Sequence, residues 1–171
     1  MTLTVTPGAS NSDSYQDLAT FKSSVTTLGL VAPGTDPELE AALRRAAIWL
    51  DANFRYRWPG TKTNGRSQAR DWPRTNAVDL EDIAIGVMEI PSELLLAQTY
   101  AASQEAKKPF SLSPVFLKGN NEKVLVAMDT MRWETRADAG TIEEMKPVLI
   151  DVQNALSTLI SFSVAPFFGV V

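Results

Sequence analysis

The chain has 171 residues, of which 44% are hydrophobic and 21% are charged, and its formal net charge at pH 7 is −4. This composition is typical of one soluble globular domain that is large enough to bury a core without covalent cross-links. Cysteine and histidine are both absent from the sequence, which excludes disulfides, thiolate metal sites, cysteine nucleophiles and Ser-His-Asp catalysis. No apolar run approaches the roughly 18 residues of a membrane span, and the N-terminus lacks the basic and apolar regions of a signal peptide. We therefore expect synthesis in a cytoplasm.

Residues 1–13 are predicted to form an N-terminal arm. Residues 2–6 alternate polar and apolar side chains, which favours a short edge strand or a docking arm, and a turn-rich linker follows. The first predicted helix begins after Asp17, a suitable N-cap, and ends at Gly29. Its apolar face consists of Leu18, Phe21, Val25 and Leu28.

The second helix is predicted over residues 37–53. Thr35 and Asp36 are candidate caps, Pro37 suits the first turn, and Glu38 lies where a capping box needs an acid. Arg44, Arg45 and Asp51 are expected to lie outside the buried stripe, which consists of Leu39, Leu43, Ala46, Ala47, Leu50 and Phe54.

A basic loop, residues 54–74, follows this helix. It carries six basic residues against one acid, Asp71, so its net charge is +5 and the other 150 residues carry −9. Loops longer than about 12–15 residues without regular structure tend to be functional or disordered. Because Trp58 and Trp72 each favour burial, we expect an ordered loop that faces something acidic.

Three further elements are predicted after the basic loop. A helix should open at Pro91 and run to about residue 107, with Leu94, Ala97, Gln98 and Ala101 on one face. Residues 110–136 indicate two or three short strands with a turn at 119–121, and a last helix is predicted over 147–160. The expected fold is therefore mainly α (α+β): a small helical bundle with a β-hairpin between the third and last helices.

The chain ends in a strongly apolar tail, residues 161–171. Such a tail must pack either on its own core or on a partner, and the sequence slightly favours a partner groove because Pro166 and Gly169 prevent a simple extension of the last helix. The candidate contact residues are Phe162, Phe167 and Phe168.

The order of these pieces resembles the tailed-phage head–tail connector adaptor family, whose members are often labelled DnaT-like single-stranded DNA-binding proteins. The resemblance covers roughly residues 14–160. Its sharpest part is Gln-Ala-Arg-Asp-Trp-Pro-Arg at residues 68–74, with Arg-Ala-Ala-Ile-Trp-Leu-Asp at 45–51 and Trp-Pro-Gly-Thr-Lys-Thr at 58–63 as weaker parts.

The resemblance implies an adaptor domain over residues 14–160 that assembles into a ring, commonly a dodecamer, in the neck of a phage particle. The ring would dock on the portal protein on one side and meet the next neck or tail protein on the other. Double-stranded DNA would pass through it without sequence recognition. No cofactor, metal, membrane contact or enzymatic activity is expected.

The candidate interface residues have two interpretations each. Trp58 and Trp72 anchor the loop in the chain's own core, act as interface anchors, or do both. The basic side chains either form an ordinary solvated surface or grip carboxylates of a neighbouring copy or of the portal; they are Arg55, Arg57, Lys62, Arg66, Arg70 and Arg74. The natural acidic partners in a head-to-tail contact are Asp79, Glu81 and Asp82, or the helix over 37–53.

Two alternative functions remain open. The basic loop could stack bases and neutralise phosphates as a single-stranded DNA-binding protein of the replication type, although the −9 charge elsewhere opposes this. A tail-completion protein at the distal end of the neck shares the same features. Asp79, Glu81 and Asp82 could also bind a hard cation, but they lack the ligand spacing of a metal loop.

Overall fold

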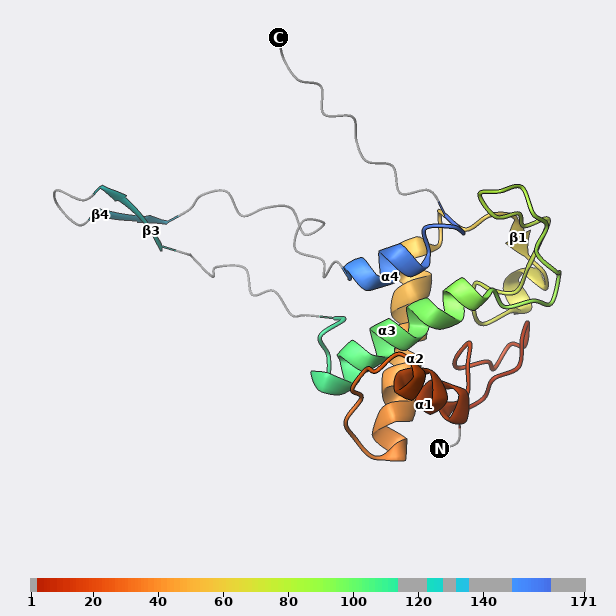
Figure 1. Cartoon of the computed structure of the whole chain (residues 1–171). Helices are drawn as coiled ribbons and strands as arrows, with labels where there is room; N and C mark the ends of the chain where they lie inside the picture. Colours follow the sequence, from red (N-terminus) through yellow and green to blue (C-terminus); the bar gives the residue numbers. More distant parts are fainter. Residues whose placement is uncertain (1–2, 114–122, 128–131, 136–148, 161–171) are drawn as a thin grey trace, which may run out of the picture. The chain divides into compact units, whose positions relative to one another are not determined.

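The structure, a computed structural model, describes residues 3–113, 123–127, 132–135 and 149–160. The chain divides into two units, one of Met1–Leu112 with Leu149–Val171 and one of Ser113–Val148. The described part of the first unit contains α1 (Leu18–Thr27), α2 (Asp36–Phe54), α3 (Ser92–Lys107) and α4 (Ile150–Ala155), as Figure 1 shows. The second contains the antiparallel hairpin β3 (Lys123–Ala127) and β4 (Arg132–Thr135). The expectation of a mainly helical fold with a small hairpin before the last helix is confirmed.

The first two helices begin where the sequence predicts. The Asp17 carboxylate accepts a hydrogen bond from the Thr20 N–H at 2.7 Å, which caps α1. In α2 the Thr35 N–H donates to the Glu38 carboxylate at 2.7 Å, the reciprocal half of a capping box. Gly29 follows α1 with a φ of +65°, a conformation that glycine adopts without strain. Local capping chemistry therefore determines these boundaries.

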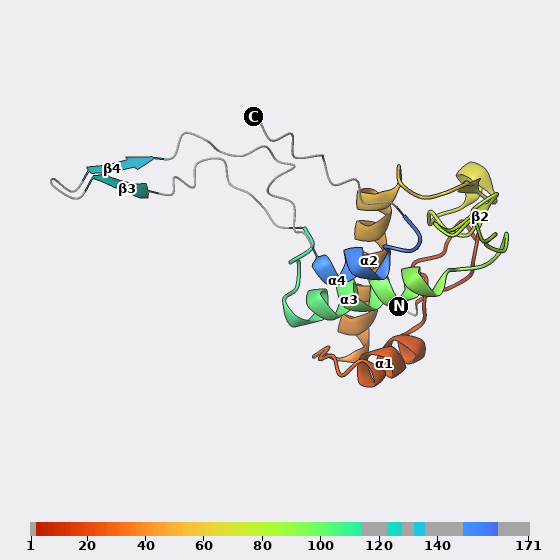
Figure 2. The same cartoon turned by 45° about the horizontal axis from the view of Figure 1, so that its top comes forward.

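The core forms where α2 and α3 pack against each other. The predicted stripe of α2 is buried along its whole length, with no member more than 4% exposed. Leu94, Ala97, Gln98 and Ala101 of α3 are fully buried, and the small alanines allow the two helices to approach closely. Helix α3 also contacts α1 and α4, so it is the central element of the bundle (Figures 1 and 2).

One prediction about regular structure is wrong, and one of the two alternatives for the N-terminal arm is excluded. The last helix was expected to run to residue 160, but α4 ends at Ala155 and the chain continues in turns, in which the Ser157 hydroxyl donates to the Asn154 carbonyl at 2.8 Å. Leu159 and Ile160 are nevertheless buried, so turns, and not a helix, place these two apolar side chains in the core. Residues 3–6 form no strand. The arm instead folds back on itself, with the Asp13 N–H donating to the Thr4 carbonyl at 2.8 Å.

We expect the two faces of α2 to respond differently to truncation. Leu50 is fully buried and Ile48, two residues earlier, is 55% exposed. Leu50→Ala should lower the free energy of unfolding by about 2–5 kcal/mol because it leaves a cavity, whereas Ile48→Ala should change it by about 0.5 kcal/mol or less. Denaturant titration of both variants measures this, and equal losses would contradict the assigned buried face.

Candidate functional site

The basic loop leaves the end of α2 and closes on itself as a small antiparallel ladder. Strands β1 (Thr61–Lys62) and β2 (Arg74–Thr75), which the sequence analysis missed, pair with each other, and the 3-10 turn η1 (Gly65–Ser67) lies between them. Gly60 has a φ of +64°, and a Cβ at this position would lie 2.3 Å from the Thr75 carbonyl oxygen. Only glycine therefore permits the close approach of the two ends of the loop.

An aromatic cluster anchors this loop in the chain's own core. Trp58 is 6% exposed and Trp72 is 1% exposed. The ring centroids of Phe54 and Trp58 are 5.7 Å apart, and those of Trp58 and Trp72 are 6.1 Å apart in an edge-to-face arrangement. Both tryptophans therefore pack inside the chain's own core and are not exposed as interface anchors.

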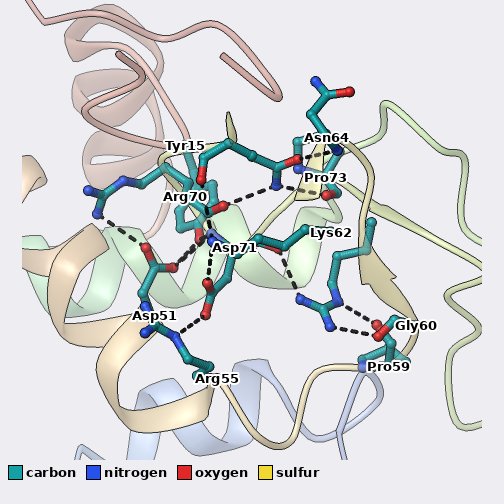
Figure 3. Close-up of polar contacts among 12 residues, drawn as sticks. Tyr15, Asp51, Arg55, Pro59, Gly60, Lys62, Asn64, Arg70, Asp71 and Pro73 are labelled. Carbon is teal, nitrogen blue, oxygen red and sulfur yellow. Dashed lines mark hydrogen bonds and ion pairs between the residues drawn. The ribbon is translucent and has the colours of Figure 1, made fainter. Parts of the chain in front are cut away.

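The Asp71 carboxylate is the electrostatic centre of the loop (Figure 3). Its side chain is fully buried, and the Lys62 Nζ lies 2.9 Å from Oδ1 while the Arg55 Nε lies 3.3 Å from Oδ2. The same carboxylate raises the pKa of the Arg55 guanidinium above its ordinary value. Burying an unpaired carboxylate costs roughly several kcal/mol of folding free energy unless nearby cations and hydrogen bonds compensate its charge. Lys62 and Arg55 are therefore used to neutralise a charge of the same chain.

A second buried carboxylate, that of Asp51 on α2, lies beside the first. Tyr15 donates its hydroxyl hydrogen to Asp51 Oδ1, and the Arg70 Nη1 lies 3.2 Å from Asp51 Oδ2. The Asp71 N–H in turn donates to the Tyr15 hydroxyl oxygen at 3.1 Å. The sequence analysis placed Asp51 outside the buried stripe of its helix; that prediction is wrong, because Tyr15 and Arg70 satisfy its carboxylate inside the protein.

Burial changes the acidity of this cluster. It raises the pKa of Asp51 to about 6, against the opposing effect of the Tyr15 hydrogen bond. Burial, and then the negative charge of Asp51, raise the pKa of Tyr15 well above its ordinary value. Tyr15 is therefore a neutral hydrogen-bond donor at neutral pH.

The motif at residues 68–74 holds the loop together from within. Gln68, only 3% exposed, donates to the Arg70 carbonyl at 3.0 Å and to the Pro73 carbonyl at 2.9 Å, and accepts from the Asn64 N–H at 3.2 Å. Arg74 donates to the carbonyls of Pro59 and Gly60, each at 2.6 Å. Both side chains are buried, and their bonding partners Pro59, Gly60, Asn64 and Pro73 are labelled in Figure 3. The residues that carry the sequence resemblance therefore have structural roles here.

The outer surface of the loop carries fewer functional groups than the sequence suggests. Arg57 and Arg66 are exposed, and Tyr56 is 97% exposed. Of the expected acidic patch, Glu81 and Asp82 are exposed, whereas Asp79 accepts hydrogen bonds from the Glu81 and Ile83 N–H groups and so stabilises its own turn. Phe162, Phe167 and Phe168 lie outside the described residues.

The sequence analysis assigned no role to the apolar side chains that are interspersed with the acidic patch along the chain. Five of them are between 42% and 59% exposed: Val78, Leu80, Ile83, Val87 and Met88. The signal was present in the sequence, because apolar residues here are interspersed with acids and no lysine or arginine occurs between Arg74 and Lys107. We call residues 78–89 the acidic–apolar loop.

Residues 1–167 match the protein family described as "Putative DnaT-like ssDNA binding protein". The chain belongs to this family. Searches of curated proteins and of solved structures found no match. The match covers both units of this DnaT-like chain, and its description names single-stranded DNA rather than a phage connector. In the described part of the DnaT-like chain, acidic side chains form no group of three or more that could hold a metal ion, and no helix has the length and apolarity to cross a membrane.

Neutralising Asp71 should destabilise this DnaT-like protein strongly. Asp71→Asn keeps the shape of the side chain but leaves the Lys62 ammonium without a buried partner, so we expect a loss of about 3 kcal/mol in the free energy of unfolding. Asp82→Asn is the matched control. Asp82 is exposed with a φ of +62°, a conformation that asparagine tolerates. The free energy of unfolding of the Asp82→Asn variant should therefore equal that of the wild type. A mild effect at Asp71 in urea titration would contradict its central role.

Asp51 should give the protein a recognisable pH dependence. Because its folded pKa of about 6 exceeds the unfolded value of 3.8, Asp51 contributes stability below pH 4 that is lost as the pH rises through 6. The difference in unfolding free energy between wild type and Asp51→Asn should therefore fall by about 2 kcal/mol between pH 4 and 7, since each pKa unit corresponds to about 1.4 kcal/mol and part of the change lies below pH 4. A difference that is constant or rises with pH would be inconsistent with this assignment.

Proposed function

We propose that this chain is a structural head–tail connector of a tailed phage, an adaptor that docks on the portal protein and acts through protein–protein contacts rather than through chemistry. The use of the basic loop inside the chain supports this proposal. Of its six cations, Arg55 and Lys62 pair with Asp71, Arg70 pairs with Asp51, and Arg74 binds backbone carbonyls. Few of its charges are available to neutralise phosphates.

The state of the aromatic residues agrees with a protein-binding role. Proteins that bind single strands stack bases on exposed aromatic side chains beside a basic groove. Trp58 and Trp72 are buried and unable to do so.

In this proposal, copies of the chain assemble head to tail into a ring, commonly of twelve, around the channel through which double-stranded DNA passes in the neck. The exposed arginines Arg57 and Arg66 of one copy would face Glu81 and Asp82 of the next. Such a contact uses two different surfaces, as a closed ring requires. The ring would dock on the portal on one side and on the next neck or tail protein on the other.

Single-stranded DNA binding is the second candidate function. The family description supports it, and so does Tyr56, which is 97% exposed between Arg55 and Arg57. One aromatic ring between two arginines could stack a base and contact phosphates.

Two binding measurements separate these functions. We expect the purified chain to bind portal assemblies, seen as an added ring by electron microscopy, and to bind a labelled oligothymidylate only in the range of about 10⁻⁴–10⁻⁶ M at physiological salt. Tyr56→Ala should then leave portal binding unchanged.

The opposite pattern would overturn the connector proposal. It consists of no portal binding together with tight oligonucleotide binding that Tyr56→Ala weakens at least about fivefold, the loss expected from one stacked base. Tyr56→Phe, which keeps the ring, is the matched control and should retain that affinity.

A further inference from the structure

The acidic–apolar loop is the largest concentration of exposed apolar side chains in the described part of the chain. Eleven large apolar residues are substantially exposed in the described residues as a whole, and five of them belong to this one loop. The others are spread over several elements, such as Ile48 on α2 and Phe110 after α3. Apolar residues scattered over a surface are ordinary, whereas five exposed ones between Val78 and Met88 of a single loop indicate something that covers them.

The loop is held in a defined shape, so its exposure does not come from a lack of order. Val78 and Ala84 form a β-bridge, and the Ile85 N–H donates to the Ala77 carbonyl at 2.9 Å. The Gly86 N–H donates to the Glu89 carboxylate at 2.9 Å, and the Thr63 hydroxyl donates to the Val87 carbonyl at 2.7 Å. A preformed surface of this kind costs little conformational entropy when another segment packs on it.

The C-terminal segment of the chain starts beside this surface. The Leu80 N–H donates to the Thr158 carbonyl at 3.0 Å, which joins the loop to the turn that follows α4. The turn ends in Leu159 and Ile160, both buried. The tail, residues 161–171, therefore begins three residues after a direct contact with the loop.

The tail has the composition that this surface requires. Its eleven residues carry no charged side chain and include three phenylalanines and three valines, so they add no side-chain negative charge beside Glu81, Asp82 and Glu89. Eleven residues reach at most about 36–40 Å when extended, which is ample for a loop contacted at Thr158. We propose that the C-terminal tail, residues 161–171, packs on the acidic–apolar loop of its own chain.

Tethering favours the chain's own tail over other occupants. A short linker gives a tethered segment an effective concentration of about millimolar, well above the concentration of a second copy in an ordinary solution. The sequence alone slightly favoured a partner groove for the tail; the exposed loop beside residue 160 provides a surface on the same chain. The contact involves this chain only, so its test is independent of portal and DNA binding.

Engineered cysteines test the contact directly, because the chain has no native cysteine. The double variant Leu80→Cys/Ala165→Cys places one thiol in the loop and one in the tail. The control is Ile48→Cys/Ala165→Cys, since Ile48 and Leu80 are both 55% exposed. Under mild oxidation we expect an intramolecular disulfide in the first variant, formed at least about tenfold faster than in the control because the two thiols are held together.

Each other outcome overturns the proposal. Disulfide-linked dimers of the Leu80→Cys/Ala165→Cys variant would show that the tail reaches a second copy. Equal rates in the two double variants, or no disulfide in either, would show that the tail has no preference for the loop.

A labelling measurement that needs no cysteine in the tail provides a second test. Leu80→Cys should react with a maleimide several-fold faster when Phe162, Phe167 and Phe168 are all changed to serine in the full-length chain, because the loop is then uncovered. Ile48→Cys should react at the same rate with either tail. An unchanged rate at Leu80→Cys would overturn the proposal, and far-ultraviolet circular dichroism checks that both chains are folded.

Discussion

The buried Asp71 carboxylate is the constraint on which the arrangement of the basic loop depends. A charge that is completely removed from water must be compensated at close range, and here Arg55 comes from the end of α2 while Lys62 comes from β1. The backbone N–H of the same residue bonds to Tyr15, which holds Asp51 of α2. One residue therefore connects the loop, the second helix and the segment that precedes α1.

This arrangement changes the meaning of the charge pattern. A count along the chain gives the loop a net charge of +5, which reads as an anion-binding surface. Three of its cations are paired in the structure with two buried carboxylates, and Arg74 donates hydrogen bonds to backbone carbonyl oxygens. Asp71 is already included in that count, so adding Asp51 lowers the net charge only from +5 to +4. The pairing nevertheless holds four of the six cations within the chain, and the apolar and acidic side chains of residues 78–89 become the more distinctive surface.

The parts of the fold that were predictable from sequence are those determined by neighbouring residues. The capping residues Asp17 and Thr35 and the 3.6-residue stripe of α2 act within a few residues, so they are legible in a single sequence. The burial of Asp51 is different, because its partners Tyr15 and Arg70 lie 36 and 19 positions away and only the tertiary structure brings them together. Likewise β1 and β2 have two residues each, too few for any alternation to show.

The buried cluster also determines where the acidic–apolar loop lies. Arg74 binds the carbonyls of Pro59 and Gly60, Thr75 pairs with Thr61, and Ala77 is 1% exposed. These contacts hold the chain immediately before Val78, the first exposed apolar side chain of the acidic–apolar loop. Loss of the ion pairs of Asp71 would displace Arg74, and with it the acidic–apolar loop that follows. A preorganised outer surface thus depends on buried charges, so residues without exposed functional groups can determine the shape of the surface that this chain presents.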